Sequence, residues 1–345
     1  MSRQRTTLAQ VAKATGVSVA TVSKVLNQRS DVAEPTRRRV LRQLRESGYQ
    51  PTGAGAAVRS SGRMIEVVFA NIRDAYSITV LEAITTCAQA DGFDVVMGRG
   101  HPLRAGRYAA DTELLLSSGR AGAILITLDT TSAQLELLRR ADYPVVVVDP
   151  LHPGLSEVVS VGATNFAGGV TATEHLLALG HRRIGHAGGP KAVDCSQARL
   201  AGYTSALRQA GIPTDESLIT HCEFRYDAGR RVAGALLDRD DRPTAIFAGN
   251  DEIALGLMEE ARRRAIRVPQ DLSLVGFDDT FMAIRSAPQL TTVAQPLLEM
   301  GRSAVRSLEQ LINHEPVPSL HVELATRLMV RDSTAPLTPS RRTPA

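Results

Sequence analysis

Apolar side chains recur at helical spacing in two short stretches near the start of the chain, and a glycine separates the two stretches. The first carries Leu8, Val11 and Ala12 on one face, and the second carries Val22, Val25 and Leu26. Gly16 permits a tight turn between them. Thr7 caps the first helix, with Gln10 reaching back to it, and Ser18 caps the second. This pattern predicts a helix-turn-helix, which reads DNA through its second helix.

From Arg63 onward, short β-branched runs alternate with amphipathic stretches. The predicted parallel strands are 64–70, 93–97, 123–126, 145–148, 158–161, 184–187, 218–221, 245–247 and 274–276. The predicted helices are 79–90, 108–117, 132–141, 168–178, 197–210, 228–237, 252–263 and 297–312, and a last strand spans 320–330. We predict an α/β fold: an N-terminal all-α helix-turn-helix headpiece followed by two doubly wound parallel-sheet lobes, each of roughly 130 residues.

The net charge of the chain changes sign at the same position, near Arg63. Residues 1–63 carry 12 Lys and Arg against 3 Asp and Glu, a net charge of +9, whereas the other 282 residues carry 28 against 33, a net charge of −5. A third predicted helix, anchored by Val40, Leu41 and Leu44, extends the basic surface with Arg37, Arg38, Arg39, Arg42 and Arg45. Such a basic segment attracts phosphates by counterion release. We therefore expect the first 63 residues to bind nucleic acid.

The patterns of common catalytic and metal sites are missing from the sequence. It has no phosphate-binding GxxxxGK[ST] loop and no histidine pair at metalloprotease spacing. Cys87, Cys195 and Cys222 lack zinc or redox spacing, which is typical of reduced cytosolic thiols. No secretory signal and no apolar stretch long enough to span a bilayer is present. We expect a cytoplasmic protein that is not an enzyme and uses no metal, cofactor or membrane.

Residues 6–63 resemble the headpiece of the lac repressor (LacI/GalR) family of bacterial transcription regulators. The resemblance rests on residues 11–27, Val-Ala-Lys-Ala-Thr-Gly-Val-Ser-Val-Ala-Thr-Val-Ser-Lys-Val-Leu-Asn. It implies that Val19, Ala20 and Lys24 face base edges. It also places Ser18, Thr21, Ser23 and Asn27 against phosphates or backbone, and we add Thr7 to this DNA-binding set. Small apolar side chains suit thymine methyl groups, and hydroxyls and amides suit phosphate oxygens.

Residues 51–63 are rich in small side chains and read as a linker. In the resembled family this segment becomes a hinge helix only on operator DNA, where two copies pair and insert a leucine into the minor groove. Val58 stands at that leucine position, and Thr52 and Ala56 replace the asparagine and arginine that are common there. Gly53 and Gly55 each lower helix stability by about 1 kcal/mol relative to alanine. We expect the hinge to be disordered away from DNA.

The resemblance also implies a two-lobed core, of the periplasmic binding protein type, in which the chain crosses three times between lobes. We place the crossings near Gly162, Leu290 and Leu320. The predicted domains are the headpiece (1–50), the hinge helix or linker (51–63), the first lobe (64–162 and 291–319), the second lobe (163–290 and 320–331) and a disordered tail (332–345). Such a fold closes around a small molecule.

Loops at the carboxyl ends of parallel strands converge on the cleft between the lobes. Asn250, Asp278 and Asp149 follow predicted strands, and the resemblance places Arg199 in the pocket with them. Carboxylates and amides suit sugar hydroxyls. Asp279 fits a helix cap as well as a ligand contact.

Two aromatic residues complete the predicted effector set. Tyr76 and Phe224 offer flat faces on which a sugar ring can stack, and each fits ordinary packing equally well. Thr164 replaces the aspartate that is common in the family at this position, a variant that we associate with relatives responding to pentoses and plant oligosaccharides.

The sequence favours a homodimeric repressor that binds an inverted-repeat operator and is released by a sugar inducer, with helix 79–90 as the dimer face by family analogy. A regulator responding to a purine or another metabolite as corepressor is the alternative. A carbohydrate-binding transport protein is a third hypothesis, against which the helix-turn-helix argues.

Overall fold

The structure is a computed structural model that describes residues 7–26, 32–46, 64–70, 72–102, 108–152 and 157–337 of the 345-residue chain. Its internal contacts divide the chain into two compact units, residues 1–63 and 64–345. No helix within the described ranges is long and apolar enough to cross a membrane.

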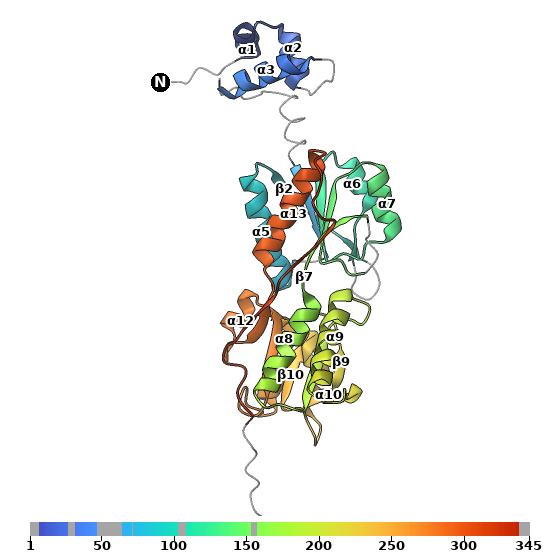
Figure 1. Cartoon of the computed structure of the whole chain (residues 1–345), viewed down its shortest axis with the longest axis vertical. Coiled ribbons are helices and arrows are strands. Elements are labelled where there is room, and N and C mark those ends of the chain that lie inside the picture. Colours follow the sequence, from blue (N-terminus) through green and yellow to red (C-terminus); the bar gives the residue numbers. More distant parts are fainter. Residues whose placement is uncertain are drawn as a thin grey trace, which may run out of the picture. The chain divides into compact units, whose positions relative to one another are not determined.

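Within its described residues, the first unit contains three helices, α1 (Leu8–Thr15), α2 (Val19–Leu26) and α3 (Glu34–Glu46), drawn in blue in Figure 1. The predicted capping box is present, because the Thr7 amide donates to Gln10 Oε1 at 2.7 Å and the Gln10 amide donates to Thr7 Oγ1 at 3.4 Å. Gly16 ends α1 with a φ of 70°, a conformation that favours glycine. The buried core consists of Val11, Ala12, Val22, Val25 and Val40. The predicted helix-turn-helix is confirmed.

The described part of the second unit contains two six-stranded sheets, each covered by helices, and a two-stranded sheet formed by β3 (His101–Pro102) and β4 (Tyr108–Ala109). The first lobe comprises β1 (Met64–Phe69), α5 (Ala75–Ala90), β2 (Asp94–Arg99), β3, β4, α6 (Thr112–Ser117), β5 (Gly122–Ile126), α7 (Ser132–Arg140), β6 (Val145–Val148), β7 (Val159–Ala163), α13 (Leu297–Ile312) and β13 (His321–Leu324). Its main sheet has the order β13-β7-β6-β5-β1-β2 and is parallel throughout.

The second lobe repeats the scheme with α8 (Asn165–Ala178), β8 (Ile184–Gly188), α9 (Asp194–Gln209), a 3-10 turn (Glu216–Leu218), β9 (Ile219–His221), α10 (Tyr226–Leu237), β10 (Ala245–Ala248), α11 (Asp251–Arg263), β11 (Ser273–Asp278), α12 (Phe281–Arg285), β12 (Thr291–Ala294) and β14 (Arg327–Met329). The sheet order is β14-β12-β11-β10-β8-β9, and β14 alone runs antiparallel within it.

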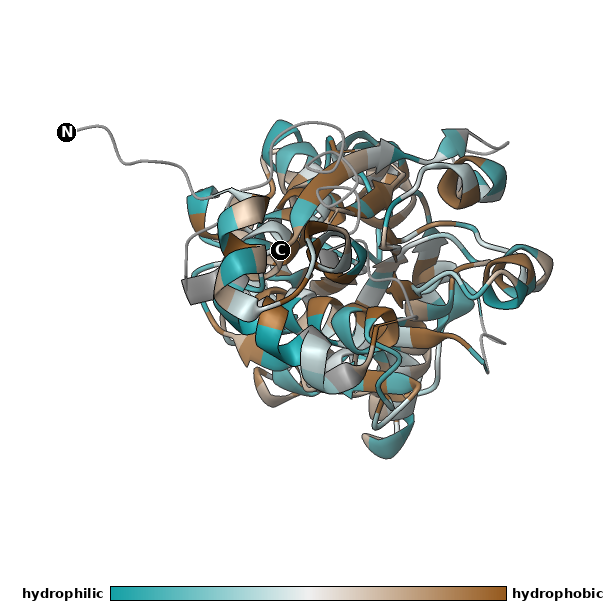
Figure 2. Cartoon of the chain, turned by 90° about the horizontal axis from the view of Figure 1, so that it is seen from above, coloured by the Kyte–Doolittle hydropathy of each residue, from teal (hydrophilic) through white to brown (hydrophobic). Residues whose placement is uncertain are grey.

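Helices cover both faces of each six-stranded sheet, and the central strands are buried. In the first lobe α5 and α13 pack on one face and α6 and α7 on the other. In the second lobe α8 and α9 cover one face and α10 and α11 the other. The helices carry both hydrophobic and hydrophilic residues (Figure 2). Continuous apolar strands such as Val145–Val148 are buried along their whole length, which explains why they lack alternation.

Two strand assignments correct the predicted lobe boundaries. β12 pairs with β11 in the second sheet, and β13 pairs with β7 in the first. The chain therefore crosses after Ala163, after Ala294 and after Leu324. The predicted strand 320–330 is two strands, one in each sheet, because the third crossing interrupts it.

Two further local predictions are wrong. Tyr108 and Ala109 form β4, which pairs with β3, and α6 begins only at Thr112, where Asp111 caps it by accepting from the Leu114 amide at 3.0 Å. The predicted tail is ordered as far as residue 337, because its polar groups find partners on the second lobe: Ser333 is fully buried, and the Leu337 amide donates to the Leu179 carbonyl at 2.8 Å. Residues 338–345 lie outside the described ranges.

Candidate functional site

The helix-turn-helix presents one face of α2 to solvent. Val22 and Val25 point into the core, whereas Val19 is 47% exposed and Ala20 and Lys24 are also exposed. An apolar side chain with this exposure on the first turn of a second helix has the placement that contact with thymine methyl groups needs.

The polar residues predicted to contact DNA differ in how they are held. Ser18 Oγ accepts from the Thr21 amide at 3.0 Å and lies 2.8 Å from Thr21 Oγ1, so these two hydroxyls form the cap of α2. Thr7 is exposed within its capping box, and Ser23 is partly buried. Asn27 and Val58 lie outside the described residues, and their roles stay predictions.

In the first lobe, Tyr76 and Asp149 form one half of the candidate effector site. Tyr76 lies on the first turn of α5, and its hydroxyl donates to Asp149 Oδ2. Asp149 follows β6 with a φ of 46°, which turns the chain at the strand end. Burial raises the pKa of Asp149, while the Tyr76 hydroxyl and the positive charge of Arg199 oppose this shift. The pKa of Tyr76 is raised well above its ordinary value by burial and by Asp149.

In the second lobe, Arg199 is the centre of the other half and is only 3% exposed. Its Nε donates to Asn165 Oδ1 at 2.8 Å, and its Nη1 donates to the Gly249 carbonyl at 2.5 Å. The guanidinium carbon lies 3.7 Å from the centre of the Phe277 ring and 5.6 Å from that of Phe224. Three elements thus fix one cation, leaving it little freedom to move.

Asp278 ends β11 beside this cation. Its Oδ1 lies 3.7 Å from Arg199 Nη1 and accepts from Gln295 Nε2 at 2.7 Å. Burial raises the pKa of Asp278 well above its ordinary value, with the charge of Arg199 opposing and that of Asp251 adding to the shift. Asp278 is therefore a buried acceptor held in place by an amide and a guanidinium.

Residues from the two lobes meet at this cluster. The positive charge of Arg199 lowers the pKa of Asp149, and the charge of Asp278 raises the pKa of Tyr76. Two hydrogen bonds also join the lobes: the Asp194 amide donates to the Leu151 carbonyl at 3.1 Å, and the Ala75 amide donates to a Glu252 carboxylate oxygen at 3.3 Å. The structure pairs Tyr76 with Asp149 in the first lobe, and Arg199 with Asp278 and Phe224 in the second. Their role in effector binding stays a prediction.

The remaining candidates have mainly structural contacts. Asn250 is buried next to Gly249, but its Oδ1 caps α11 by accepting from the Ile253 amide at 2.9 Å. Asp279 caps no helix and instead pairs with Arg331 at 2.6 Å. Thr164 Oγ1 lies 3.1 Å from Thr326 Oγ1 and accepts from the Thr326 amide at 3.0 Å, so it joins two of the crossing segments.

Several residues of the cluster were not predicted. Asn165 and Gln295 follow strands that cross between lobes, and the strand-end rule that found Asp278 applies to them as well. Cys195 is a neighbour of Arg199 on α9, and burial raises the pKa of its thiol to about 11. Ser196 Oγ and Gln295 Oε1 are buried and have no hydrogen-bond partner among the described residues.

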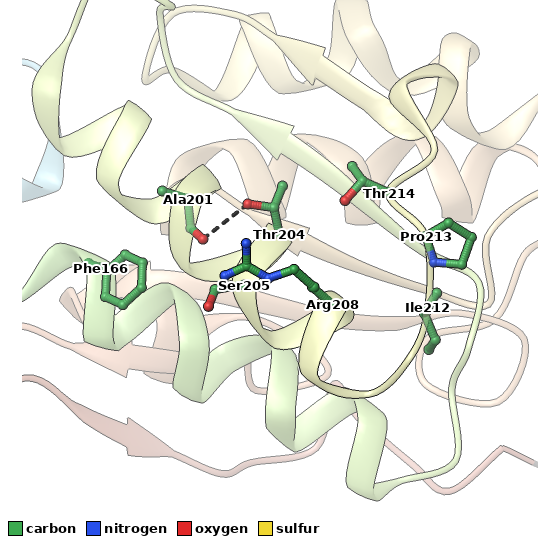
Figure 3. A pocket seen from close by; sticks show the side chains of 8 residues that line it. All are labelled: Phe166, Ala201, Thr204, Ser205, Arg208, Ile212, Pro213 and Thr214. Atoms are coloured by element: carbon green, nitrogen blue, oxygen red, sulfur yellow. Dashed lines mark hydrogen bonds between the residues drawn. The ribbon is translucent and has the colours of Figure 1, made fainter.

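Two hollows on the second lobe lie apart from this cluster. One, of about 500 Å³, is lined by Phe166 on α8, by α9 and by the loop after it, and Figure 3 shows its side chains. The other, of about 790 Å³, lies among α10, α11 and α12 and is lined in part by Tyr226, Met258 and Met282. Neither hollow is lined by a residue of the predicted effector set.

A helix-turn-helix unit joined to a two-lobed α/β core with a buried polar cluster defines a DNA-binding regulator with a small-molecule site. Residues 7–52 match the family described as bacterial regulatory proteins, lacI family, and residues 173–334 match the periplasmic binding protein-like domain. The chain is 34% identical over 336 residues to the HTH-type transcriptional regulator DegA of Bacillus subtilis, a match that covers 96% of this chain and 99% of that protein.

Similar agreement is found with other relatives. The HTH-type transcriptional regulator CelR of Thermobifida fusca is 33% identical over 342 residues, with 96% and 99% covered. The structure of a transcriptional regulator CelR–cellobiose complex matches with a TM-score of 0.72 at 30% identity, covering 95% of this chain and 100% of that one. The lac repressor dimer bound to operator and the anti-inducer ONPF gives a TM-score of 0.72 at 27% identity, with 96% and 100% covered.

This chain belongs to the lacI family of bacterial transcription regulators. The resemblance stated for its headpiece and the predicted two-lobed fold are both confirmed. It is a DNA-binding transcriptional regulator and not an enzyme.

Proposed function

We propose that this regulator is a homodimeric repressor of carbohydrate uptake or catabolism genes, and that a sugar bound between its lobes releases it from an inverted-repeat operator. The observation that carries this proposal is a buried polar pair at the strand ends of each lobe: Tyr76 with Asp149 in the first, and Arg199 with Asp278 in the second. A ligand held by both halves favours the closed arrangement of the lobes, because it binds that arrangement more tightly than any other.

The chemistry of the cluster favours a polyhydroxylated ligand. Asp149 and Asp278 are buried carboxyls, and Ser196 Oγ and Gln295 Oε1 are buried polar atoms that lack partners among the described residues. A buried acceptor without a donor is unfavourable by about 1–3 kcal/mol. Sugar hydroxyls supply donors to such acceptors, and the Phe224 ring beside Arg199 offers a surface for the apolar face of the sugar.

Similar structures with bound sugars support this ligand class. One is a complex of a transcriptional regulator with cellobiose, and another is a LacI family regulator from Enterococcus faecium with bound ribose, which is 28% identical to this chain. We propose a sugar for this chain on these grounds together with its acceptor-rich cluster. A purine ligand is the competing outcome of the experiment below.

On the DNA side, we propose that α2 lies in the major groove. Val19, Ala20 and Lys24 then face base edges, and the capped N-termini of α1 and α2 lie near phosphates. Two headpieces read the two halves of the operator, and the hinge segments meet at its centre, where Val58 enters the minor groove.

Homodimer formation follows from this arrangement, and the first lobe offers an apolar face for it. Ile78 on α5 is 42% exposed and Met97 on the edge strand β2 is 62% exposed. Exposed apolar side chains beside a sheet edge are typical of interaction surfaces. We propose this face, formed by α5 and β2, as the first-lobe part of the dimer interface.

The test is fluorescence anisotropy of the protein on labelled DNA from its own promoter region, at fixed salt, with cellobiose, xylose, ribose and hypoxanthine added one at a time. Release by a sugar is the expected result. Tighter binding with hypoxanthine would replace the proposal by the corepressor alternative. Operator binding that no compound alters would contradict the ligand-responsive part of the proposal.

A further inference from the structure

The turn that carries Asp278 has an unusual backbone. Asp278 has a φ of 106° and Asp279 a φ of 57°, so two consecutive residues other than glycine adopt left-handed conformations. Such conformations persist only where the surrounding structure enforces them. Contacts that hold this turn therefore also set where the Asp278 carboxyl lies.

One set of contacts comes from α11. Asp251 is 1% exposed, and its Oδ2 accepts from the amide and the hydroxyl of Thr280 at 2.7 and 2.9 Å. Its other oxygen accepts from Thr292 Oγ1 at 2.6 Å. Asp251 thereby ties the residue that follows the turn to β12.

The second set comes from Arg331, just beyond β14. Its Nη2 donates to Asp279 Oδ1 at 2.6 Å and its Nη1 donates to the Leu290 carbonyl at 2.8 Å. The side chains of Arg331 and Asp279 are 13% and 16% exposed, so their ion pair is largely shielded from solvent. The planar guanidinium can make both bonds at once, which a lysine cannot do in the same geometry.

Arg331 is itself held by the segment that it begins. We name residues 331–337 the C-terminal strap. Ser333 Oγ donates to the Leu274 carbonyl at 2.6 Å, His175 Nε2 lies 3.0 Å from Thr334 Oγ1, and His181 Nε2 lies 3.0 Å from the Ala335 carbonyl. The strap is thus anchored along the second lobe on both sides of β11 and β12.

From these contacts we infer that Arg331 is a positioning residue for effector binding: the C-terminal strap, through the Arg331–Asp279 pair, holds the turn that presents Asp278 to the ligand. This inference rests on the proposed function, because it assigns Asp278 to the effector. It places part of the control of ligand affinity in a segment 52 residues beyond Asp279.

The experiment uses the full-length chain and compares Arg331→Gln with Arg331→Lys and with Arg267→Gln, which removes an exposed arginine pair of the second lobe outside the strap. Cellobiose is the first probe, followed by xylose and ribose, and operator binding is measured in parallel. Arg331→Gln should lower the affinity for the sugar that the wild type binds by about 10-fold or more, since it removes a charge-assisted pair. Arg331→Lys should recover part of the loss, and Arg267→Gln should bind sugar as the wild type does.

Hydrogen exchange at the Thr280 amide gives a readout that does not depend on the ligand. Arg331→Gln should speed this exchange, and Asp279→Asn should add little in the Arg331→Gln background because both changes remove the same pair. Unchanged exchange in Arg331→Gln, or unchanged sugar affinity in a responsive protein, would overturn the inference. If the wild type responds to no sugar, the proposed function fails, and the exchange experiment still decides whether Arg331 holds the turn.

Discussion

The Nη1 atom of Arg199 lies 3.7 Å from Oδ1 of Asp278, and the two side chains are only 4% and 5% exposed. The same guanidinium is fixed by Asn165 and by the Gly249 carbonyl, so contacts within the protein set its position. Taking such charges out of water is unfavourable, and breaking the pair would leave one of them uncompensated. A pair of this kind is suited to a ligand that completes its hydrogen bonding.

Asp278→Asn should separate sugar binding from DNA binding. The substitution keeps the volume of the side chain but removes an acceptor that sugar hydroxyls require, so we expect sugar affinity to fall by about 10- to 100-fold. Operator affinity without sugar should stay within about twofold of the wild type. Calorimetry and anisotropy measure the two quantities. Asp271→Asn, in an exposed pair with Arg267, is the matched control. Equal losses of both activities would mean misfolding.

Lys24→Ala should weaken operator binding and leave sugar binding intact. A lysine at a DNA surface contributes about 1–3 kcal/mol when it contacts a base edge, and a phosphate contact would instead lower the salt slope by about 1. Anisotropy at several salt concentrations distinguishes the two roles. Lys191→Ala, on an exposed loop of the second unit, serves as control. Unaltered operator affinity in Lys24→Ala would remove this residue from the DNA-binding set.

Val58→Ala tests the hinge. A smaller wedge parts a base step less well, so operator binding should weaken and depend less on the central base step. The measurement is anisotropy on operators that differ only at that step. Val330→Ala changes an exposed valine of the second unit and should have no effect. Retention of full affinity and central-step preference in Val58→Ala would argue against an inserted side chain.

Asp251 should give the core a pH-dependent stability. Burial raises the pKa of Asp251 to about 7, above the ordinary value of 3.8. The folded state then binds more protons than the unfolded state between these values, so the free energy of unfolding falls as pH rises from about 4 to about 7. The upper bound of this loss is about 4 kcal/mol.

Urea unfolding at several pH values, compared between the wild type and Asp251→Asn, measures this contribution. The variant should lack that decline. Asp271 makes the opposite contribution, because its hydrogen bonds with Arg267 lower its pKa. The stability that Asp271 gives the wild type is lost as the pH falls into the acid range, and Asp271→Asn should lack that loss. If the free energy of unfolding depends on pH in the same way in the wild type and in Asp251→Asn, Asp251 does not have the raised pKa.

Gly169→Ala should loosen the effector site through the backbone. A Cβ at Gly169 would lie 2.3 Å from the Arg199 carbonyl oxygen, so α8 and α9 would have to separate. Overpacking of this kind destabilises a protein by about 1–3 kcal/mol. Gly185→Ala, with its nearest atom at 3.3 Å, should cost less. Thermal unfolding compares the two, and a smaller loss at Gly169 than at Gly185 would contradict this packing argument.

Local signals in the sequence predicted most of the fold. Thr7 and Gln10 form the predicted capping box, and Val145–Val148 forms a fully buried strand, because both depend on neighbouring residues. β13 pairs with β7, which lies more than a hundred residues earlier in the chain, whereas β12 pairs with the nearby β11. The apolar pattern of either strand would be the same in either lobe. Periodicity therefore placed the strands but misassigned their sheets.

The candidate site likewise contains some residues that local sequence signals predict and others that they do not. Asp149 and Asp278 were found because they follow apolar strands, and the structure holds them opposite Arg199. Asn165 and Gln295 also follow strands, so the same rule applies to them, but the sequence does not show that they contact Arg199 and Asp278. The contacts of Ser333 along the strap had no local signal, since each depends on a carbonyl or amide of another element.

The most direct test of the account is reciprocal linkage between sugar and operator. The affinity of the releasing sugar is measured by calorimetry with free protein and with protein saturated by operator, and operator affinity is measured with and without that sugar. Thermodynamics requires the same coupling factor in both directions, and we predict a factor of about 5–150 that favours the sugar on the DNA-free protein. Equal sugar affinity on free and operator-bound protein would contradict the claim that this cluster controls DNA binding.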